Sequence, residues 1–366
     1  MKISGVDIYT YDIKHEAYSH FTALVDTLKE VFIKITADNG LTGFGEARAN
    51  FQYVLGQNQE GMINVLQNEL APAIIGEDPF EINMLINKMD KAIVSNSGAK
   101  SAIDLALFDL IGKALNSPLY KLIGGNSGKK SVPTNHSIGF GTPQEAKEQA
   151  LQLVEKGFYL LKIRVGMGKP SLDIERVKIV RDAVGDEVLL AVDVNQGWSP
   201  GKAISILKKM EKYDLEYAEQ PVPAENIFGL ARVRKSVNIP IMADESIHSP
   251  EDAFNLIRHD AVDLFHLKQI KAGGIFKTRK IIGLAEAAGI SYMQGHTSEG
   301  RLATSAAVHL AVSSNPQHFE LGFDRVIDDP TSGLEIIQGS VLVPKEPGLG
   351  VNINEQKLHH RITIIG

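Results

Sequence analysis

The chain has 366 residues, of which 43% are hydrophobic, 22% are charged and none is cysteine. The lack of cysteine excludes disulfide scaffolds, thiolate zinc sites, iron–sulfur clusters and cysteine nucleophiles, so a bound metal would need oxygen or imidazole ligands. A net charge of −6, from 38 Lys and Arg against 44 Asp and Glu, argues against a nucleic-acid partner. Because neither a secretory signal nor a membrane-spanning apolar run is visible, we expect a cytoplasmic protein with no membrane partner.

The first part of the chain is typical of an α+β domain. Residues 6–9 and 31–36 alternate like strands, and Asp38-Asn39-Gly40 separates the second run from residues 41–46, which predicts a hairpin. Residues 58–75, 79–93 and 98–116 have the periodicity of helices. A glycine-rich run at 124–130 follows. We therefore expect an α+β domain over residues 1–125.

Beyond residue 132 short apolar runs alternate with helical stretches. The runs lie at 159–165, 188–194, 215–219, 239–244, 262–268 and 290–294. Intervals of about 25 residues fit parallel βα units. They favour an α/β fold with a modified (β/α) TIM-type barrel over residues 126–328, although spacing alone leaves an open doubly wound sheet possible. The tail, residues 329–366, has strand-like runs within 334–354 and is expected to return to the first domain.

Polar residues stand at the ends of these apolar runs. They are Lys162, Arg164, Asp193, Asn195, Glu219, Gln220, Asp244, Glu245, Lys268 and His296. In a barrel the carboxyl ends of the strands meet at one mouth, where active sites lie. Three carboxylates there, Asp193, Glu219 and Asp244, would repel one another unless a cation joined them, and oxygen ligands from separate elements suit Mg²⁺. Beside such a cation we expect Lys162 and Lys268 to have lowered pKa values, as a lysine base requires.

In combination these motifs resemble the enolase superfamily. They are the Lys-x-Arg strand, the three carboxylates in their Glu-Gln-Pro and Ala-Asp-Glu contexts, and Lys268-x-x-Lys-Ala-Gly-Gly. The resemblance covers essentially the whole chain and is nearest to the muconate-lactonizing branch, which includes dipeptide epimerases, N-acylamino acid racemases and o-succinylbenzoate synthases. That branch has a lysine at the end of the sixth strand, as Lys268 is here.

This resemblance implies a mechanism and a domain arrangement. Asp193, Glu219 and Asp244 would bind Mg²⁺, the metal would hold the carboxylate of a small substrate, and removal of the α-proton would give an enediolate. Lys268 is the candidate acid/base on one face. The N-terminal domain would be a capping domain, completed by the C-terminal tail, and family habit suggests a homo-oligomer.

The sequence departs from the branch at the second strand, where Lys-x-Lys is usual and Arg164 replaces the second lysine. A guanidinium is a poor base and a good carboxylate clamp, and a structural ion pair is the alternative role. Lys162 would act only if the substrate sat differently. His296, in the loop after the seventh strand, could protonate a leaving hydroxyl.

Three functions therefore remain open. The first is an isomerase, acting as a racemase, epimerase or cycloisomerase. The second is a dehydratase of a hydroxy acid or sugar acid, which is a lyase and needs one base. The third is a non-catalytic barrel that binds a metal or a ligand.

Several further residues are candidates for supporting or substrate-contacting roles. Asn195 and Gln220 are expected to support the metal ligands, while Glu245 is expected to point away from Asp244 and to serve as a partner behind the site or a helix cap. Lys271 is expected to be solvated. Glu299 and Glu320 would contact substrate or a lysine, with a salt bridge as the alternative.

Two apparent motifs do not predict other chemistry. His15-Glu16-Ala17-Tyr18-Ser19-His20 misses the His-Glu-x-x-His zinc spacing by one residue. By resemblance it lies in the specificity loop of the capping domain, so Tyr18 and His20 are substrate-contact candidates. Gly43-Phe44-Gly45 and Gly139-Phe140-Gly141 lack the third glycine of a dinucleotide fingerprint, and no organic cofactor is expected.

Overall fold

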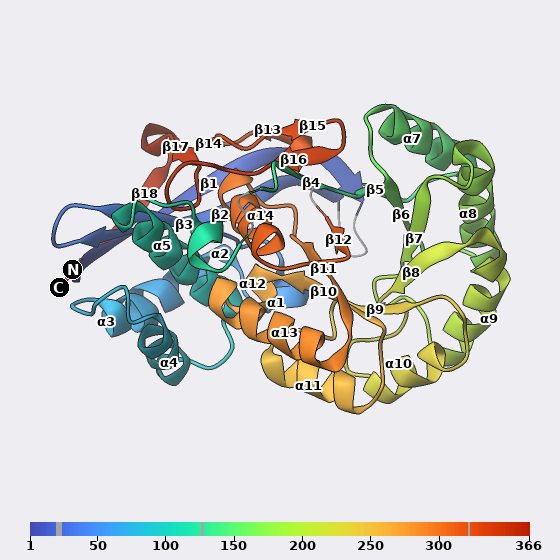
Figure 1. The fold of residues 1–366 in the computed structure, drawn as a ribbon, viewed down its shortest axis with the longest axis horizontal. Helices are drawn as coiled ribbons and strands as arrows, with labels where there is room; N and C mark the ends of the chain where they lie inside the picture. The colour runs from blue at the N-terminus through green and yellow to red at the C-terminus, as the bar shows by residue number, and fades with distance from the viewer. Residues whose placement is uncertain (20–23, 126–127, 321–322) are drawn as a thin grey trace.

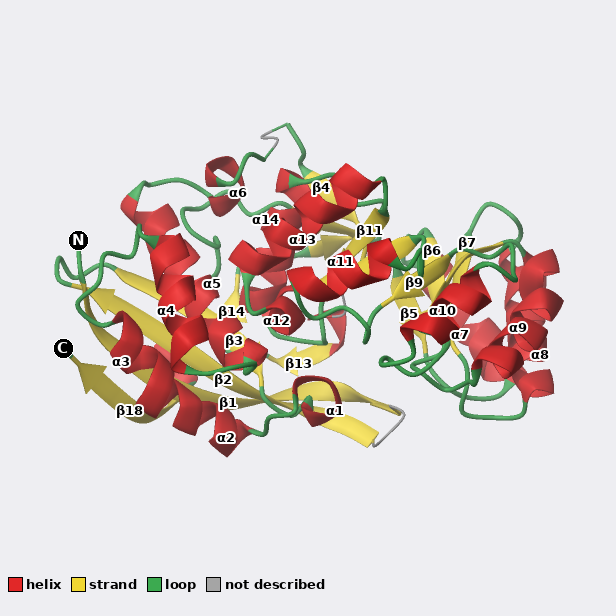
Figure 2. Cartoon of the chain, turned by 90° about the horizontal axis from the view of Figure 1, so that it is seen from below, coloured by secondary structure: helices red, strands yellow, loops and turns green. Residues whose placement is uncertain are grey.

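The structure is a computed structural model that describes residues 1–19, 24–125, 128–320 and 323–366. It consists of an antiparallel sheet with helices packed on it and a parallel barrel ringed by helices (Figures 1 and 2). The two termini lie together at the end of the molecule farthest from the helices α7, α8 and α9. Within the described ranges, no helix combines the length and the apolar character that crossing a membrane requires.

The capping sheet is formed by strands from both ends of the chain. Its strands are β1 (Ile3–Ser19), β2 (Leu24–Ala37), β3 (Thr42–Arg48), β13 (Val326–Asp328) and β18 (His359–Ile365). The order is β13-β1-β2-β3, and β18 also pairs with β1. The turn between β2 and β3 at residues 38–41 confirms the predicted hairpin. Since β18 pairs antiparallel with β1 over residues 5–10, the tail returns to this sheet as expected.

The helices of this part follow the predicted ranges with one interruption. They are α1 (Gln52–Leu55), α2 (Gln59–Val65), a π-helical turn η1 (Leu66–Leu70), α3 (Ala71–Ile74), α4 (Ile82–Ala92), α5 (Ser97–Ala114) and α6 (Leu119–Leu122). The predicted helix 58–75 is divided near Pro72, which has no N–H to donate to the helical ladder. Helix α5 is buried along almost its whole length, because it lies between the capping sheet and the barrel helix α13.

Eight parallel strands form the barrel in sequence order. They are β5 (His136–Ile138), β6 (Leu160–Arg164), β7 (Leu189–Asp193), β8 (Leu215–Glu219), β9 (Ile241–Ala243), β10 (Leu264–Lys268), β11 (Ser291–Gly295) and β12 (His318–Phe319). A parallel bridge between Asn135 and Glu320 joins the first and last strands, and the Asn135 N–H donates to the Phe319 carbonyl at 2.8 Å. The barrel is therefore confirmed, and the open-sheet alternative is wrong.

Helices surround the barrel on the outside. They are α7 (Pro143–Glu155), α8 (Pro170–Val184), α9 (Pro200–Met210) with the 3₁₀ turn η2 (Glu211–Tyr213), α10 (Ile227–Arg234), α11 (Pro250–Arg258), the short α12 (Gln269–Ala272), α13 (Ile275–Ala288) and α14 (Arg301–Ser313). The strands are buried on both faces, which explains their continuous apolar runs. Their outward side chains pack under the helices.

The remaining short segments lie just before the first barrel strand or after the last one. They are β4 (Ser131–Pro133), η3 (Phe323–Arg325), β14 (Thr331–Ser332), β15 (Ile336–Ile337), β16 (Ser340–Leu342), β17 (Asn352–Ile353) and η4 (Glu355–Lys357). β16 pairs with β4, which precedes the barrel, so part of the tail stays at the barrel before β18 reaches the capping sheet. The domain limits at 125/126 and 328/329 stay predictions.

Candidate active site

Alternation along the strands produces the site. A layer of apolar side chains closes the barrel interior, and these residues are Leu160, Ala191, Tyr217, Met242, Leu264 and Met293. Because side chains repeat with period two, the next inward positions on β6, β7 and β8 are Lys162, Asp193 and Glu219. The carboxyl ends of the strands therefore present ionisable groups above an apolar layer, which is typical of barrel active sites.

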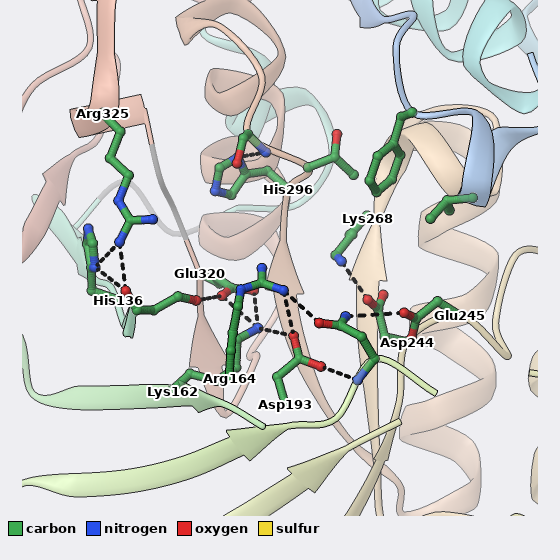
Figure 3. A pocket seen from close by; sticks show the side chains of 16 residues that line it. His136, Lys162, Arg164, Asp193, Asp244, Glu245, Lys268, His296, Glu320 and Arg325 are labelled. Atoms are coloured by element: carbon green, nitrogen blue, oxygen red, sulfur yellow. Dashed lines mark hydrogen bonds and ion pairs between the residues drawn. The ribbon is translucent and has the colours of Figure 1, made fainter. Parts of the chain in front are cut away.

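A pocket opens above this layer and is lined by residues of both the capping domain and the barrel (Figure 3). Its lining residues are Phe51, Val54, His136, Ser137, Lys162, Arg164, Asp193, Asn195, Asp244, Glu245, Lys268, His296, Thr297, Ser298, Glu320 and Arg325. Most of the residues proposed from the sequence meet there. Glu219 lies at its base, fully buried. Tyr18 belongs to β1 by its backbone, and His20 lies outside the described residues, so their substrate contacts stay predictions.

The three carboxylates at the strand ends are buried together. Asp193 and Glu219 are register partners on β7 and β8, and Asp244 follows β9 directly. Burial, and then the charge of Glu219, raises the pKa of Asp193 to about 6. Burial, followed by the charges of Asp244 and Asp193, raises the pKa of Glu245 to about 8. Crowded negative charges away from water favour either protonation or a bound cation.

His266, which the sequence analysis missed, lies inside this group. One ligand atom each from Glu219, Asp244 and His266 fall within 4.8 Å of one another. His266 Nδ1 lies 2.8 Å from Glu219 Oε1. The imidazole is fully buried, which, together with the charge of Lys268, lowers its pKa well below the usual value. Period-two alternation from Lys268 could have identified it, and Gly295 on β11 leaves room, since a Cβ there would lie 2.0 Å from His266 Nε2.

Asp193 lies outside that tight group because other partners hold its oxygens. Its Oδ1 accepts the Asn195 N–H at 3.0 Å, and its Oδ2 lies 3.5 Å from Arg164 Nη1. Arg164 Nη1 also donates to Asn195 Oδ1 at 2.6 Å, and Asn195 Nδ2 donates to Glu245 Oε1 at 3.3 Å. Asn195 thus links the arginine to the carboxylates. Gln220 supports the site from below, since its Oε1 accepts the Asp244 N–H at 2.9 Å.

The prediction that Glu245 points away from the site is wrong. It lines the same pocket as Asp244. The reason is that β9 ends at Ala243, so the alternation of a strand no longer governs the two residues that follow it.

The two lysines face the carboxylates from different strands. Lys162 Nζ donates to Glu219 Oε2 at 2.8 Å and lies 2.7 Å from Glu320 Oε1. Lys268 Nζ donates to Asp244 Oδ2 at 2.7 Å. Burial by itself lowers the pKa of each ammonium, but the adjacent carboxylates outweigh it and raise both pKa values. The predicted lowering concerned lysines beside a bound cation, and it stays a prediction.

The expectation that Lys271 is solvated is also wrong. The short helix α12 turns it under the site, where it is buried. Its Nζ donates to Asp244 Oδ1, to the Asp244 carbonyl at 2.5 Å and to the His266 carbonyl at 3.1 Å. Asp244 is thus held by Lys268 on the pocket side and by Lys271 from behind.

The remaining candidates are divided between the pocket wall and its support. His296 lines the pocket, and its Nδ1 accepts the Ser298 N–H at 3.0 Å. Glu320 lines it and pairs with Lys162. Glu299 is instead buried behind the loop, where its Oε2 accepts the Thr297 N–H at 3.3 Å, so a substrate contact is not supported.

The pocket wall has further residues that no sequence signal indicated. Arg325 Nη2 donates to the Ser137 carbonyl at 2.7 Å and lies 3.2 Å from His136 Nδ1 (Figure 3). Phe51 and Val54 reach the pocket from the capping domain. Their positions depend on how two separate parts of the chain pack together.

The fold and the site define a barrel enzyme of the enolase type, and comparison with known proteins agrees. Residues 3–124 match the family "Mandelate racemase / muconate lactonizing enzyme, N-terminal domain", and residues 145–357 match "Enolase C-terminal domain-like". The chain therefore belongs to the mandelate racemase/muconate lactonizing enzyme family of the enolase superfamily, in its muconate-lactonizing branch.

Several relatives are similar over nearly the whole chain. An L-Ala-D/L-Glu epimerase of Clostridium acetobutylicum is 39% identical over 89% of this chain and 92% of its own. An N-succinyl-L-Arg/Lys racemase of Bacillus cereus is 32% identical, with 98% and 97% covered. A chloromuconate cycloisomerase of Delftia acidovorans is 35% identical, with 98% and 99% covered. The crystal structure of a dipeptide epimerase from Cytophaga hutchinsonii, complexed with Mg and D-Ala-L-Val, has a TM-score of 0.94 and 32% identity, with both chains fully covered.

These relatives are racemases, epimerases and cycloisomerases, and this chain is an isomerase of the same kind. Its chemistry is the metal-dependent removal of the α-proton of a small carboxylate substrate through an enediolate.

Proposed function

We propose that the enzyme uses Mg²⁺ held by Asp193, Glu219 and Asp244. The fit rests on the donor set, since three buried carboxylates lie at adjacent strand ends, and burial, followed by the charge of Glu219, raises the pKa of Asp193. Hard oxygen ligands of this kind suit Mg²⁺. The bound ion would supply a positive charge for the substrate carboxylate and for the negative charge that develops on it. His266 would orient Glu219 through the 2.8 Å contact between its Nδ1 and Glu219 Oε1.

Lys268 is the proposed base. It lines the pocket from β10, whereas Lys162 and Arg164 line it from β6, and the carboxylates of β7, β8 and β9 come between them in strand order. This placement of cationic groups on both sides of the carboxylates is the observation that carries the proposal. Without a cation, Asp244 raises the pKa of Lys268. A cation bound to Asp244 would offset that effect, and a neutral Lys268 amine would then take the α-proton, while Arg164, always charged, would hold a substrate oxygen.

Lys162 is the proposed proton donor for the opposite face. Glu219 and Glu320 keep it an ammonium, which suits a donor better than a base. With Lys268 on one side and Lys162 on the other, the enzyme would invert an α-carbon. We therefore propose epimerisation or racemisation of a dipeptide or an N-acylamino acid, the substrate classes named for its relatives.

Proton exchange tests this proposal directly. The enzyme is incubated with excess MgCl₂ in D₂O with L-Ala-L-Glu, with hydrophobic dipeptides and with N-succinyl amino acids. ¹H NMR follows the α-proton. We expect deuterium incorporation with inversion for one class, abolished by EDTA. Incorporation into none of them would contradict the proposed substrates.

A one-base reaction is the second candidate, favoured by one observation. Arg164 is engaged by Asn195 and Asp193 where a second lysine base would be needed, and His296 lines the pocket. Cycloisomerisation, or dehydration of a hydroxy acid, needs only one base, Lys268; in the dehydration His296 would donate the proton with which the hydroxyl leaves as water. Consumption of a muconate, or a 2-keto acid trapped by semicarbazide from a sugar acid, would decide for it. Heat on titration with MgCl₂ without turnover of any substrate would instead indicate a non-catalytic barrel. The cytoplasmic location and the homo-oligomer stay predictions.

A further inference from the structure

The barrel helices differ in how their N-termini are capped. Four of them begin at a residue whose own side chain accepts a backbone N–H of the first turn, namely Thr142 for α7, Ser199 for α9, Asn226 for α10 and Ser249 for α11. Helices α13 and α14 begin instead at Gly274 and Gly300, which have no side chain, and neither helix has an acidic residue in its first turn. Helix α13 follows β10, which ends at Lys268, after the short α12, and α14 follows the loop after β11 that begins with His296.

A carboxylate of the capping domain replaces the missing cap of α14. Glu46 on β3 accepts the N–H of Gly300 with Oε1 and that of Ala303 with Oε2, both at 2.9 Å. Its side chain is buried. A Cβ on residue 300 would lie 2.3 Å from Glu46 Oε1, so glycine is required for this carboxylate to reach the helix. The cap thus comes from a residue more than 250 positions earlier in the chain.

Helix α13 is capped in the same way from α5. Asp104 accepts the Ile275 N–H with Oδ1 at 2.5 Å and the Phe276 N–H with Oδ2 at 3.3 Å. It is fully buried, and a Cβ on residue 274 would lie 2.2 Å from its Cγ. Two independent glycine–carboxylate pairs therefore join the capping domain to consecutive helices of the barrel.

The same capping strand holds the pocket wall. Arg48 lies two residues after Glu46 on β3 and therefore on the same face of the strand. It is buried and donates through Nη1 to the Thr297 carbonyl. Its guanidinium lies 5.2 Å from the centre of the Phe51 ring. Phe51, His296, Thr297 and Ser298 all line the pocket. The capping domain and the loop after β11 are thus joined both at the helix terminus and at the wall.

We propose that Glu46 and Asp104 are positioning residues that set the loops after β11 and β10, and with them His296 and Lys268, by capping α14 and α13 from the other domain. An N-terminal cap satisfies backbone N–H groups of the first turn that have no partner within the helix. Because each cap belongs to the capping domain, a shift of that domain relative to the barrel would also move the N-termini of α13 and α14. The expected effect of losing these caps on turnover rests on the proposed function. The expected effect on the order of the loops does not.

Hydrogen exchange and kinetics on matched variants test this. Glu46→Ala removes the cap of α14, and Thr142→Ala removes the local cap of α7, a helix of the same length, 13 residues. We expect Glu46→Ala, at saturating MgCl₂, to raise amide exchange in residues 296–304 at least tenfold and to lower kcat about 100-fold, as a displacement of about 1 Å can. Thr142→Ala should raise exchange only in α7 and leave kcat within twofold.

Milder variants keep the test decisive if the alanine variant fails to fold. Glu46→Gln and Asp104→Asn retain one acceptor oxygen and should give intermediate exchange, in residues 296–304 and 273–279 respectively, with kcat partly restored relative to alanine. Wild-type exchange in these segments for both amide variants and Glu46→Ala would overturn the proposal, as would loosened segments with unchanged kcat. If wild type turns over no substrate, the exchange measurements still decide on the caps, and only the proposed function fails.

Discussion

Replacing Lys268 separates catalysis from stability, because Asp244 has a second lysine. Lys268→Met removes the ammonium 2.7 Å from Asp244 Oδ2, but Lys271 still pairs with Oδ1 of the same carboxylate. Removing one partner of an isolated buried ion pair costs about 3–5 kcal/mol. Since Asp244 keeps Lys271, we expect the smaller loss of one charged hydrogen bond, about 1.5–3 kcal/mol. Loss of a general base should lower turnover about 10²–10⁴-fold.

Lys271→Met is the matched control on the same carboxylate. It removes the bond to Asp244 Oδ1 and also leaves the carbonyls of Asp244 and His266 without this donor, so the loss of stability should reach about 3–5 kcal/mol. Lys271 does not line the described pocket, so turnover of the folded variant at saturating Mg²⁺ should stay within tenfold of wild type. Chemical denaturation gives the stabilities and α-proton exchange in D₂O gives the rates.

The order of the two variants is the decisive result. Lys268→Met should nearly eliminate α-proton exchange with the smaller loss of stability. Lys271→Met should lose more stability and keep most of the exchange. If Lys268→Met exchanged the α-proton at more than a tenth of the wild-type rate, the assignment of the base would be refuted. If Lys271→Met were the more stable of the two, the argument from shared pairing of Asp244 would fail.

Further predictions concern the metal, the arginine and a buried carboxyl. EDTA should lower the unfolding temperature and added MgCl₂ restore it, whereas Asp193→Asn should need a higher MgCl₂ concentration for the same recovery, measured by scanning fluorimetry. Arg164→Lys creates the Lys-x-Lys pattern. With Lys162 as the proton donor for the opposite face, the ratio of inversion to exchange in D₂O should stay close to that of wild type; a tenfold rise would show that wild type lacks a second acid/base and would refute the role of Lys162. Burial raises the pKa of Asp104 from 3.8 to about 7, so its proton is bound more tightly in the folded protein. The unfolding free energy of wild type minus that of Asp104→Asn should therefore fall as the pH rises from about 4 to about 7, with no further change above. A rise of this difference with pH, measured by denaturation, would contradict the prediction.

Local rules explain how much of the fold and site followed from the sequence. The repeated βα spacing predicted the barrel, and the period of two placed Lys162, Arg164 and Asp193 on inward positions, because alternation is a property of each strand alone. The same rule applied to Lys268 would have found His266. It failed for Glu245, because the strand ends before that residue and nothing periodic governs the loop.

Tertiary packing decided which side chains from different elements contact one another. Lys271 is buried because α12 folds back under β10. The pKa values of the two active-site lysines are raised because carboxylates from other strands of the barrel lie within hydrogen-bonding distance. The glycines at 274 and 300 show in the sequence only as helix starts without caps; their partners, Asp104 and Glu46, lie far away in the chain. The sequence by itself thus determined which chemical groups the strands carry, through short-range geometry. Which of them touch, and how the capping domain holds the barrel, depended on the packing of distant segments, because contact between them is set by the whole fold.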